Sequence, residues 1–359
     1  MSVRSRIHRV SYAERTQCAS SSLQAHANQP YFALYDEAFA NILGSNPSIE
    51  LALENEFPLF HEAGVYLPQQ DAFYITSNRF VPKNSSEQTI LVGKLTRSNG
   101  TWEYDIIDTD VVMGNGGINY KEGVVFCDQG SKTRPGGLVH MEVHPPYQTK
   151  PLIDGFHSRL FNSVNDVVVH SDGSLWFTDP LYGHEQGFRE RPALPCQVYR
   201  FSESTGDIRV VADGFNRPNG LCFSPDEQTM YITDTDYIHG DGTTDLSRVS
   251  TIYAFDVIAR HGSHFLANRR VFAMASFGAP DGIKCDLEGN VYSGCGDGVN
   301  VWSPGAKLLG KVVIPGGVAN FCFARKGELL LLNETRVWIV NIDKKVQGAL
   351  LKNMGTEVE

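Results

Sequence analysis

The stretch Ala279-Pro280-Asp281-Gly282-Ile283-Lys284-Cys285-Asp286-Leu287-Glu288-Gly289-Asn290-Val291-Tyr292 shows the pattern on which most of the chain is built. A polar residue and a small residue precede a short apolar strand, a turn follows at residues 288–290, and a second strand begins. The same order of polar residue, small residue, strand, turn and strand recurs along the chain. The polar residues that begin the copies are Glu62, Asn115, Asn165, Asn219, Asp281 and Asn320.

The spacing of these copies predicts the fold. The copies begin at positions 62, 115, 165, 219, 281 and 320, so the steps are 53, 50, 54, 62 and 39 residues. A repeat of about 50 residues made of short strands and turns is typical of one four-stranded propeller blade. We therefore predict an all-β, six-bladed β-propeller over residues 48–359, with an N-terminal arm and short helical extension over residues 1–47.

The N-terminal segment is expected to complete the ring. Apolar residues recur at helical spacing from Tyr31 to Leu43 and stop at Gly44, which predicts a helix on the outside or over one end of the propeller. Residues 49–54 alternate and predict a strand, which we assign as the outer strand of the last blade. Such a strand would remove two open sheet edges. Residues 345–351 are the alternative for the same position.

Composition limits the classes of partner. The net charge of −10 argues against nucleic acid or an anionic membrane, and no run of 18 apolar residues predicts a membrane span. Seven cysteines occur without a Cys-x-x-Cys pair, and the first 29 residues are polar. These features predict a cytoplasmic monomer. No Gly-x-Ser-x-Gly, His-Glu-x-x-His or P-loop motif is present.

The first strand of each propeller blade lines the central channel, so the six polar residues are expected to converge there. They offer two carboxylates and four amides, and a hard cation such as Ca²⁺ takes about six to eight oxygen ligands. Such a cation is a Lewis acid, and a neighbouring carboxylate can act as a base. The pattern predicts metal-assisted hydrolysis of an ester-like bond, with Asp281 as base and Glu62 as the second carboxylate. The alternatives are a purely structural ion, or turn-forming residues without a metal.

Other residues are expected to contact the substrate. Two long inserts, residues 180–195 and 237–249, are predicted to lie over the channel mouth, because long loops on a rigid scaffold tend to determine specificity. The residues predicted to bind substrate are Asn115, Asn320, His184, His239 and Tyr182. His61 is predicted to point into its blade, since successive strand residues face opposite sides.

Several stretches show a resemblance to a known family. They are Phe161-Asn162-Ser163-Val164-Asn165-Asp166-Val167-Val168-Val169, Ser171-Asp172-Gly173-Ser174-Leu175-Trp176-Phe177-Thr178-Asp179-Pro180, Arg217-Pro218-Asn219-Gly220 and Pro280-Asp281-Gly282. With them, residues 48 to 345 resemble the gluconolactonase and senescence-marker-protein (regucalcin) family of six-bladed propellers. Tyr182-Gly183, with residues 186–188 and 197–201, is similar to the fungal lactonase branch.

The resemblance implies a function and a ligand set. It implies one divalent metal, usually calcium, bound by Glu62, Asn165, Asn219 and Asp281, with Asp281 also activating water. The implied reaction is hydrolysis of a small-molecule lactone. Animal sugar lactonases of the family have a substrate-contacting arginine where this chain has Ser163, which argues against a gluconolactone-like substrate.

Three other functions remain open at this point. Relatives on the same propeller include phosphotriesterase-like hydrolases. Others are non-hydrolytic ring-forming enzymes, such as a pericyclase or cyclase of fungal secondary metabolism. The third alternative is a non-catalytic metal-binding propeller.

Overall fold

Tight hairpins and buried middle strands give each repeat the form of a four-stranded antiparallel sheet. In the turn Ser171-Asp172-Gly173, Gly173 has a φ of 81°, a left-handed conformation that glycine adopts without steric cost. The strand that follows, β15 (Leu175–Asp179), is buried along its whole length. The computed structural model describes residues 6–11, 14–15, 28–98 and 100–356.

The sheets follow one another along the chain as six blades. Blade one contains β4 (Glu62–Leu67), β5 (Ala72–Thr76), β6 (Val92–Ser98) and β7 (Thr101–Ile107). Blade two contains β8 (Gly114–Tyr120), β9 (Gly123–Asp128), β10 (Gly137–Glu142) and β11 (Thr149–Ile153). A two-stranded hairpin, β12 (Gly155–Phe156) and β13 (Arg159–Leu160), precedes blade three, which contains β14 (Val167–Val169), β15, β16 (Gln197–Ser202) and β17 (Asp207–Ala212).

The remaining blades use longer or additional strands. Blade four contains β18 (Pro218–Phe223), β19 (Thr229–Asp234), β20 (Thr251–Arg260) and β21 (Ser263–Met274). Blade five contains β22 (Ile283–Cys285), β23 (Val291–Cys295), β24 (Gly298–Trp302) and β25 (Leu308–Val313), extended by β2 (Tyr31–Leu34) and β1 (Ile7–Arg9). Blade six contains β26 (Asn320–Phe323), β27 (Glu328–Asn333), β28 (Arg336–Asn341) and β3 (Ser48–Glu54).

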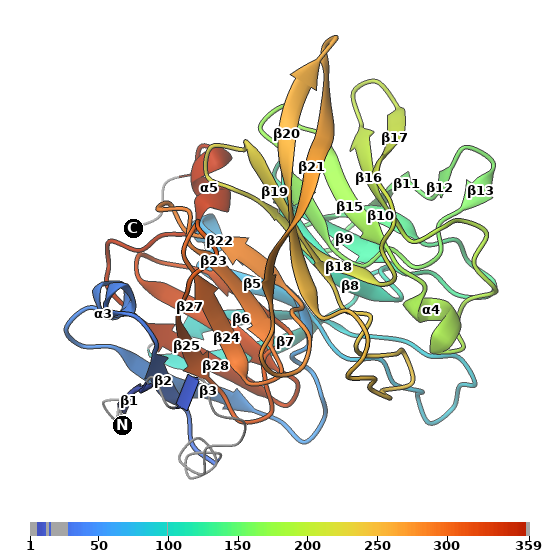
Figure 1. Cartoon of the computed structure of the whole chain (residues 1–359). Coiled ribbons are helices and arrows are strands. Elements are labelled where there is room, and N and C mark those ends of the chain that lie inside the picture. Colours follow the sequence, from blue (N-terminus) through green and yellow to red (C-terminus); the bar gives the residue numbers. More distant parts are fainter. Residues whose placement is uncertain (1–5, 12–13, 16–27, 99, 357–359) are drawn as a thin grey trace.

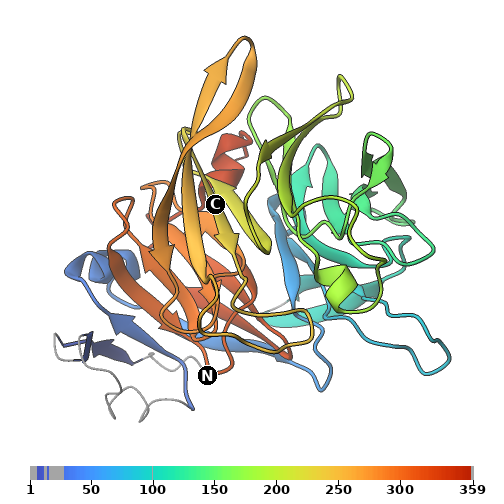
Figure 2. The same cartoon turned by 45° about the vertical axis from the view of Figure 1, so that its right-hand side comes forward.

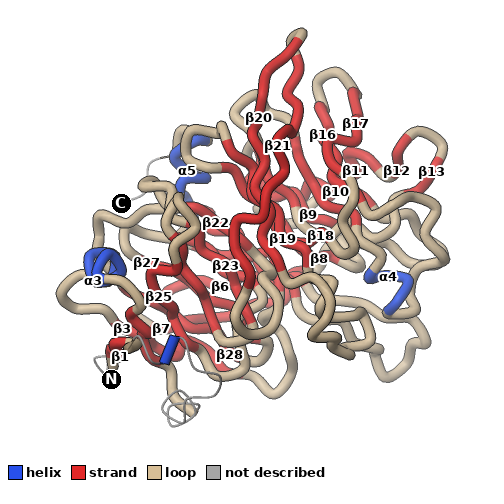
Figure 3. Tube along the Cα trace, in the orientation of Figure 1, coloured by secondary structure: helices blue, strands red, loops and turns tan. Residues whose placement is uncertain are grey.

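The blades close into a ring, which confirms the predicted six-bladed propeller. The first strand of each blade contacts the first strand of the next, from β4 through β8, β14, β18, β22 and β26 back to β4. A separate hydrophobic cluster fills each of the six interfaces between blades. The core is therefore divided among the interfaces and surrounds a channel. Figures 1 and 3 show that strands make up most of the regular structure.

The predicted closing strand is confirmed. Strand β3 pairs antiparallel with β28, from Ser48 opposite Asn341 to Glu54 opposite Arg336. Residues 345–351 do not take that position. They lead instead into a short helix, α5 (Ala349–Asn353), at one end of the channel (Figure 1).

The helix predicted over residues 31–43 is correct only in its second half. Residues 31–34 form β2, which pairs with β25, and the helix α3 begins at Glu37 (Glu37–Leu43). Asp36 caps it by accepting a hydrogen bond from the N–H of Ala38, so the helix starts there. All four residues of β2 are buried, which suits a strand inside a sheet better than one face of a helix. Most of the predicted arm lies outside the described residues.

Helix α3 packs on the outside of blade five, where Phe39 meets the backbone of Gly310. A Cβ atom at Gly310 would lie 2.0 Å from the ring of Phe39, so glycine makes this contact possible. Whether residues 1–47 form a unit separate from the propeller over 48–359 stays a prediction, and this contact offers a test of it.

Replacement of Phe39 by alanine is expected to destabilise the whole propeller. Its side chain is 1% exposed, and loss of such a ring costs about 3–5 kcal/mol of unfolding free energy. The matched control is Phe57→Ala, since Phe57 is 65% exposed and its loss should cost less than about 0.5 kcal/mol. Denaturant titration measures both values. Equal stabilities would mean that α3 is not part of the propeller's cooperative unit.

Candidate active site

A cavity of about 430 Å³ lies at the end of the channel where the inner strands begin. Five of the six residues at the starts of the repeats line it, namely Glu62, Asn115, Asn165, Asn219 and Asp281. Each is at or within two residues of the first position of β4, β8, β14, β18 or β22. The convergence expected from the repeat is therefore present.

Buried threonines hold the backbone of three of these residues in place. Each threonine lies on the second strand of one blade and donates to a carbonyl at the start of the next blade. The hydrogen bonds run from Thr76 Oγ1 to Asn115 O (2.9 Å), from Thr178 Oγ1 to Asn219 O (2.7 Å) and from Thr233 Oγ1 to Asp281 O (3.1 Å). All three threonines are fully buried. This repeated contact joins neighbouring blades directly behind the cavity.

Several oxygen atoms of the cavity have no protein partner. Among the described residues, Oδ1 of Asn115, Oδ1 of Asn165 and Oδ1 of Asp281 are buried and accept no hydrogen bond. A buried acceptor without a partner costs about 1–3 kcal/mol. Three such oxygens facing one cavity therefore fit a cation or ordered water.

The carboxylates of Glu62 and Asp281 add an electrostatic cost to that of the unpartnered oxygens. Burial raises the pKa of the Asp281 carboxyl well above its usual range, and the negative charge of Glu62 raises it more. Burial likewise raises the pKa of Glu62, although the neighbouring His61 opposes this effect. Two enclosed carboxylates that repel each other would be stabilised by a positive charge placed between them.

Asn320 does not line the cavity, contrary to the prediction that it binds substrate. Its Nδ2 donates to Glu62 Oε2 at 2.6 Å, and its Oδ1 accepts from the N–H of Phe321. One polar atom of the amide therefore orients Glu62, and the other is held by the backbone of Phe321. Its position at the start of β26 follows the repeat, but its neighbour Ala319 faces the cavity instead.

Both long inserts cover the cavity. Only some of the residues predicted on these inserts line it. Tyr182 and His239 line it, whereas His184 is exposed on α4 (Tyr182–Glu185) and lies outside it. The helical turn directs Tyr182 inward, where its hydroxyl pairs with Thr235, and leaves His184 on the solvent side. Gln186, which was not predicted, lines the cavity.

Arg217 holds the two inserts together. Its guanidinium pairs with Glu185 of the first insert and with Asp236 at the base of the second. Glu185 also accepts the N–H of Gly240 at 2.8 Å, and Arg217 Nη2 lies 3.2 Å from Nδ1 of His239. The shape of the cavity mouth thus depends on one largely buried arginine, directly before the β18 strand.

The prediction missed one wall of the cavity, which His61, Asn78, Arg79 and Glu334 form. His61 was expected to point into its blade, but it precedes β4 and is outside the regular alternation. Its Nδ1 lies 2.6 Å from Glu334 Oε1, and Asn78 donates to the other oxygen of Glu334. Because Glu334 is 273 positions away, sequence spacing gave no sign of this pair.

His61 adds a positive charge to this wall. Burial by itself lowers the pKa of the His61 imidazole, but the charge and hydrogen bond of Glu334, with the charges of the two cavity carboxylates, raise it to about 9. The imidazole is therefore protonated at neutral pH. It can donate to an oxygen atom of a bound molecule.

The other end of the channel is covered by α5. A second cavity of about 490 Å³ there is lined by residues of the inner strands, among them Asn119 and Lys284, and by residues 347–353, which include α5. Figure 2 shows α5 and α4 on different sides of the blades. A small molecule therefore reaches the carboxylates from the side of α4 and the inserts. No helix in the described part of the chain has the length and apolar character needed to cross a membrane.

Comparison with known proteins identifies the class. The profile of the SMP-30/gluconolactonase/LRE-like region matches residues 119–332, so the chain belongs to this family. Lactonohydrolase oryL of Aspergillus oryzae is 29% identical over 319 residues, which cover 82% of this chain and 70% of that protein. The gluconolactonase of Zymomonas mobilis is 29% identical over 223 residues, 59% of each chain. The protein is a lactonase-like hydrolase that acts on a carboxylic ester bond.

Solved structures agree with the fold. A gluconolactonase from Xanthomonas campestris superposes with a TM-score of 0.69 and 25% identity, over 88% of this chain and 95% of that one. A calcium-binding protein, regucalcin, from Agrobacterium tumefaciens superposes with a TM-score of 0.58 at 18% identity, over 84% of this chain and 95% of that one. The second likeness shows the fold alone.

Replacing Glu334 by glutamine is expected to lower the pKa of His61. The substitution removes the nearest negative charge, so the imidazole should lose its proton closer to neutral pH. NMR titration of the histidine ring signals in metal-free protein measures this pKa. The exposed Glu87→Gln variant is the control and should leave it unchanged. An unaltered titration in Glu334→Gln would contradict the pairing.

Proposed function

We propose that the protein hydrolyses a small-molecule lactone in the cavity at the channel mouth, with one divalent cation, preferably Ca²⁺. The residues that would hold the cation are Glu62, Asn165, Asn219 and Asp281. The observation behind this proposal is the group of buried, unpartnered oxygens beside two enclosed carboxylates. The ligand set is all oxygen with two negative charges, which suits a hard divalent ion. The regucalcin neighbour, described as calcium-binding, agrees with this choice.

When bound, the cation would supply Lewis acidity at the lactone carbonyl. Asp281 would accept a proton as the oxygen of water bonds to the carbonyl carbon. The ester C–O bond of the ring then breaks, and the same proton is returned to the departing ring oxygen, which leaves a hydroxy acid. Oδ1 of Asp281, which is buried and accepts no hydrogen bond, would bind the ion, and Oδ2 would serve as the base. Asn320 keeps Glu62 oriented throughout.

The remaining wall residues would orient the substrate. Protonated His61 and the guanidinium of Arg79 offer donors on one side, and Asn115 offers an amide. Tyr237 and Ile238 of the second insert add an apolar part to the cavity mouth. Ser163 is buried and bonded to the carbonyl of Pro180, so no arginine enters the cavity from this position. We therefore propose a lactone with an apolar portion, of the kind made in secondary metabolism, as substrate.

The setting we propose is a cytoplasmic monomer. Five of the seven cysteines, namely Cys127, Cys222, Cys285, Cys295 and Cys322, are free and buried, as small apolar residues in a reducing compartment are. The mouth contains His239 and Asp241 beside its apolar residues, so nothing in the described cavity favours a cyclase or a phosphotriesterase over a lactonase.

Removal of divalent metal is expected to abolish hydrolysis, and calcium is expected to restore it. The assay measures proton release from aldonolactones, aromatic lactones and macrocyclic lactones, with calcium and with a chelator. Loss that calcium does not reverse would contradict the proposed ion. Activity that persists in chelator would contradict metal dependence itself.

Asp281→Asn should lower kcat about a hundred- to ten-thousand-fold while an oxygen ligand for the ion remains. Asp281→Ala should in addition weaken calcium binding, measured by calorimetry. Asp245→Asn is the matched control, since Asp245 lies half-buried in the second insert outside the cavity. Near-normal turnover in Asp281→Asn would rule out this residue as the base.

A further inference from the structure

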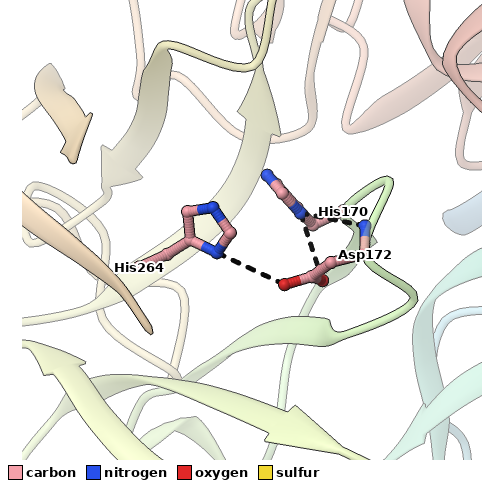
Figure 4. Close-up of side chains that lie close together, drawn as sticks. All are labelled: His170, Asp172 and His264. Carbon is pink, nitrogen blue, oxygen red and sulfur yellow. Dashed lines mark hydrogen bonds and ion pairs between the residues drawn. The ribbon is translucent and has the colours of Figure 1, made fainter. Parts of the chain in front are cut away.

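A second group of metal-binding side chains lies away from the cavity, where the β14–β15 turn of blade three meets the long β20–β21 hairpin. It consists of His170, Asp172 and His264, called here the hairpin cluster (Figure 4). His170 directly follows β14, and Asp172 lies in the turn. His264 is the second residue of β21. Because Asn165 precedes β14 and His170 follows it, this cluster and the cavity are at opposite ends of that strand.

The distances within the hairpin cluster suit a four-coordinate transition metal. Nδ1 of His170 lies 3.1 Å from Oδ1 of Asp172, and Nδ1 of His264 lies 3.3 Å from Oδ2 of Asp172. All three ligand atoms lie within 4.8 Å of one another. Tetrahedral zinc, with bonds of about 2.0–2.1 Å, places neighbouring ligand atoms about 3.3 Å apart. A small decrease in the distances between the three ligand atoms would complete such a site.

The contacts of His170 favour the tautomer with its proton on Nε2. The backbone N–H of Asp172 donates to Nδ1 of His170, so Nδ1 is the unprotonated nitrogen, and a metal ion would take the place of this hydrogen bond. Nε2 lies 3.3 Å from Oε2 of Glu227, whose negative charge favours a proton on that nitrogen. A carboxylate that orients the far nitrogen of a histidine is a common partner of metal-binding imidazoles.

Oδ1 of Asp172 accepts from the N–H and the hydroxyl of Ser174. It also lies 3.1 Å from the unprotonated Nδ1 of His170, and a cation between these two acceptors would relieve their repulsion. His264 Nδ1 is also buried and accepts or donates no hydrogen bond. Arg200 compensates part of the Asp172 charge, since its Nη2 lies 2.9 Å from Asp172 Oδ2. His170 is 7% exposed, whereas His264 is 26% exposed and leaves a route for an ion.

We propose that the hairpin cluster binds one zinc ion through His170 Nδ1, His264 Nδ1 and the Asp172 carboxylate, with water as the fourth ligand. Imidazole nitrogens select zinc over calcium, so this site and the oxygen-only cavity prefer different metals. The ion joins two blades. It fixes the β20–β21 hairpin, which projects beyond the other sheets, to blade three (Figures 1 and 2).

The test uses the full chain with calcium present in excess, so that the cavity is filled and zinc reports on the hairpin cluster alone. Calorimetry should show one zinc per chain, and Co²⁺ in its place should give the intense visible absorption of a four-coordinate site. His264→Gln should weaken zinc binding at least about tenfold and remove that absorption. His261→Gln is the matched control, since His261 is exposed at the tip of the same hairpin.

Two results would overturn the proposal. One is the absence of stoichiometric zinc binding to the calcium-loaded chain. The other is equal zinc affinity in the wild-type chain and in His264→Gln, with circular dichroism showing both to be folded. A second variant, Glu227→Gln, distinguishes a specific site from adventitious binding. Glu227 would not bind the ion itself and contacts only His170 among the proposed ligands, so its replacement should weaken zinc binding only at a specific site. Lactonase activity is not measured, so failure here leaves the proposed reaction unaffected.

Discussion

The close approach of the inner strands at the channel mouth is the constraint on which the site depends. A Cβ at Gly116 would lie 2.6 Å from the carbonyl oxygen of Asn165, and one at Gly220 would lie 2.4 Å from that of Asp281. A Cβ at Gly282 would lie 2.3 Å from Oδ1 of Asn320. In three of the six copies, glycine after the polar residue therefore lets the inner strand touch the start of the next one. This contact explains the polar-then-small pattern of the repeat, and it brings the polar side chains together.

The same approach creates an electrostatic problem that packing cannot solve. The hydrophobic clusters lie between the blades, whereas the polar residues line the cavity at the axis, where apolar packing does not satisfy their buried oxygens. Asn320 satisfies one oxygen of Glu62, and Asp166 turns its carboxylate onto the backbone N–H groups of Val167 and Leu221. Asn115, Asn165 and Asp281 keep unpartnered oxygens. Because α5 covers the far end of the channel, the proposed ion and the substrate would both enter from the side of α4 and the inserts.

The features predicted correctly from the sequence were mostly those that depend on the repeat. Blade number, the closing strand over residues 49–54 and the convergence of the polar residues all follow from one pattern that recurs with small variation. His61 could not be placed in this way. Ala63 and Gly64 have φ values of 67° and 68° and make a bulge in β4, so strand alternation does not extend back to His61. Residues 31–34 were mistaken for helix because a fully apolar run of four fits both periodicities, and pairing with β25 decided between them.

Departures from the repeat are more informative about function than the repeat itself. The longest step, 62 residues between the fourth and fifth copies, contains both the insert over the cavity and the long β20–β21 hairpin. The first supplies His239 to the mouth, and the second supplies His264 to the hairpin cluster. Neither residue has an equivalent in the other copies, so periodicity gives no account of them.

The regular part of each blade fixes a rigid frame and the axial oxygens, since any change there would disturb a neighbouring blade. Additional length can be accommodated only at the strand ends, and there it brings new side chains to the surface without altering the ring. The added segments therefore contribute to the cavity mouth and, through His264, to the hairpin cluster, alongside residues of the regular blades such as His61 and His170.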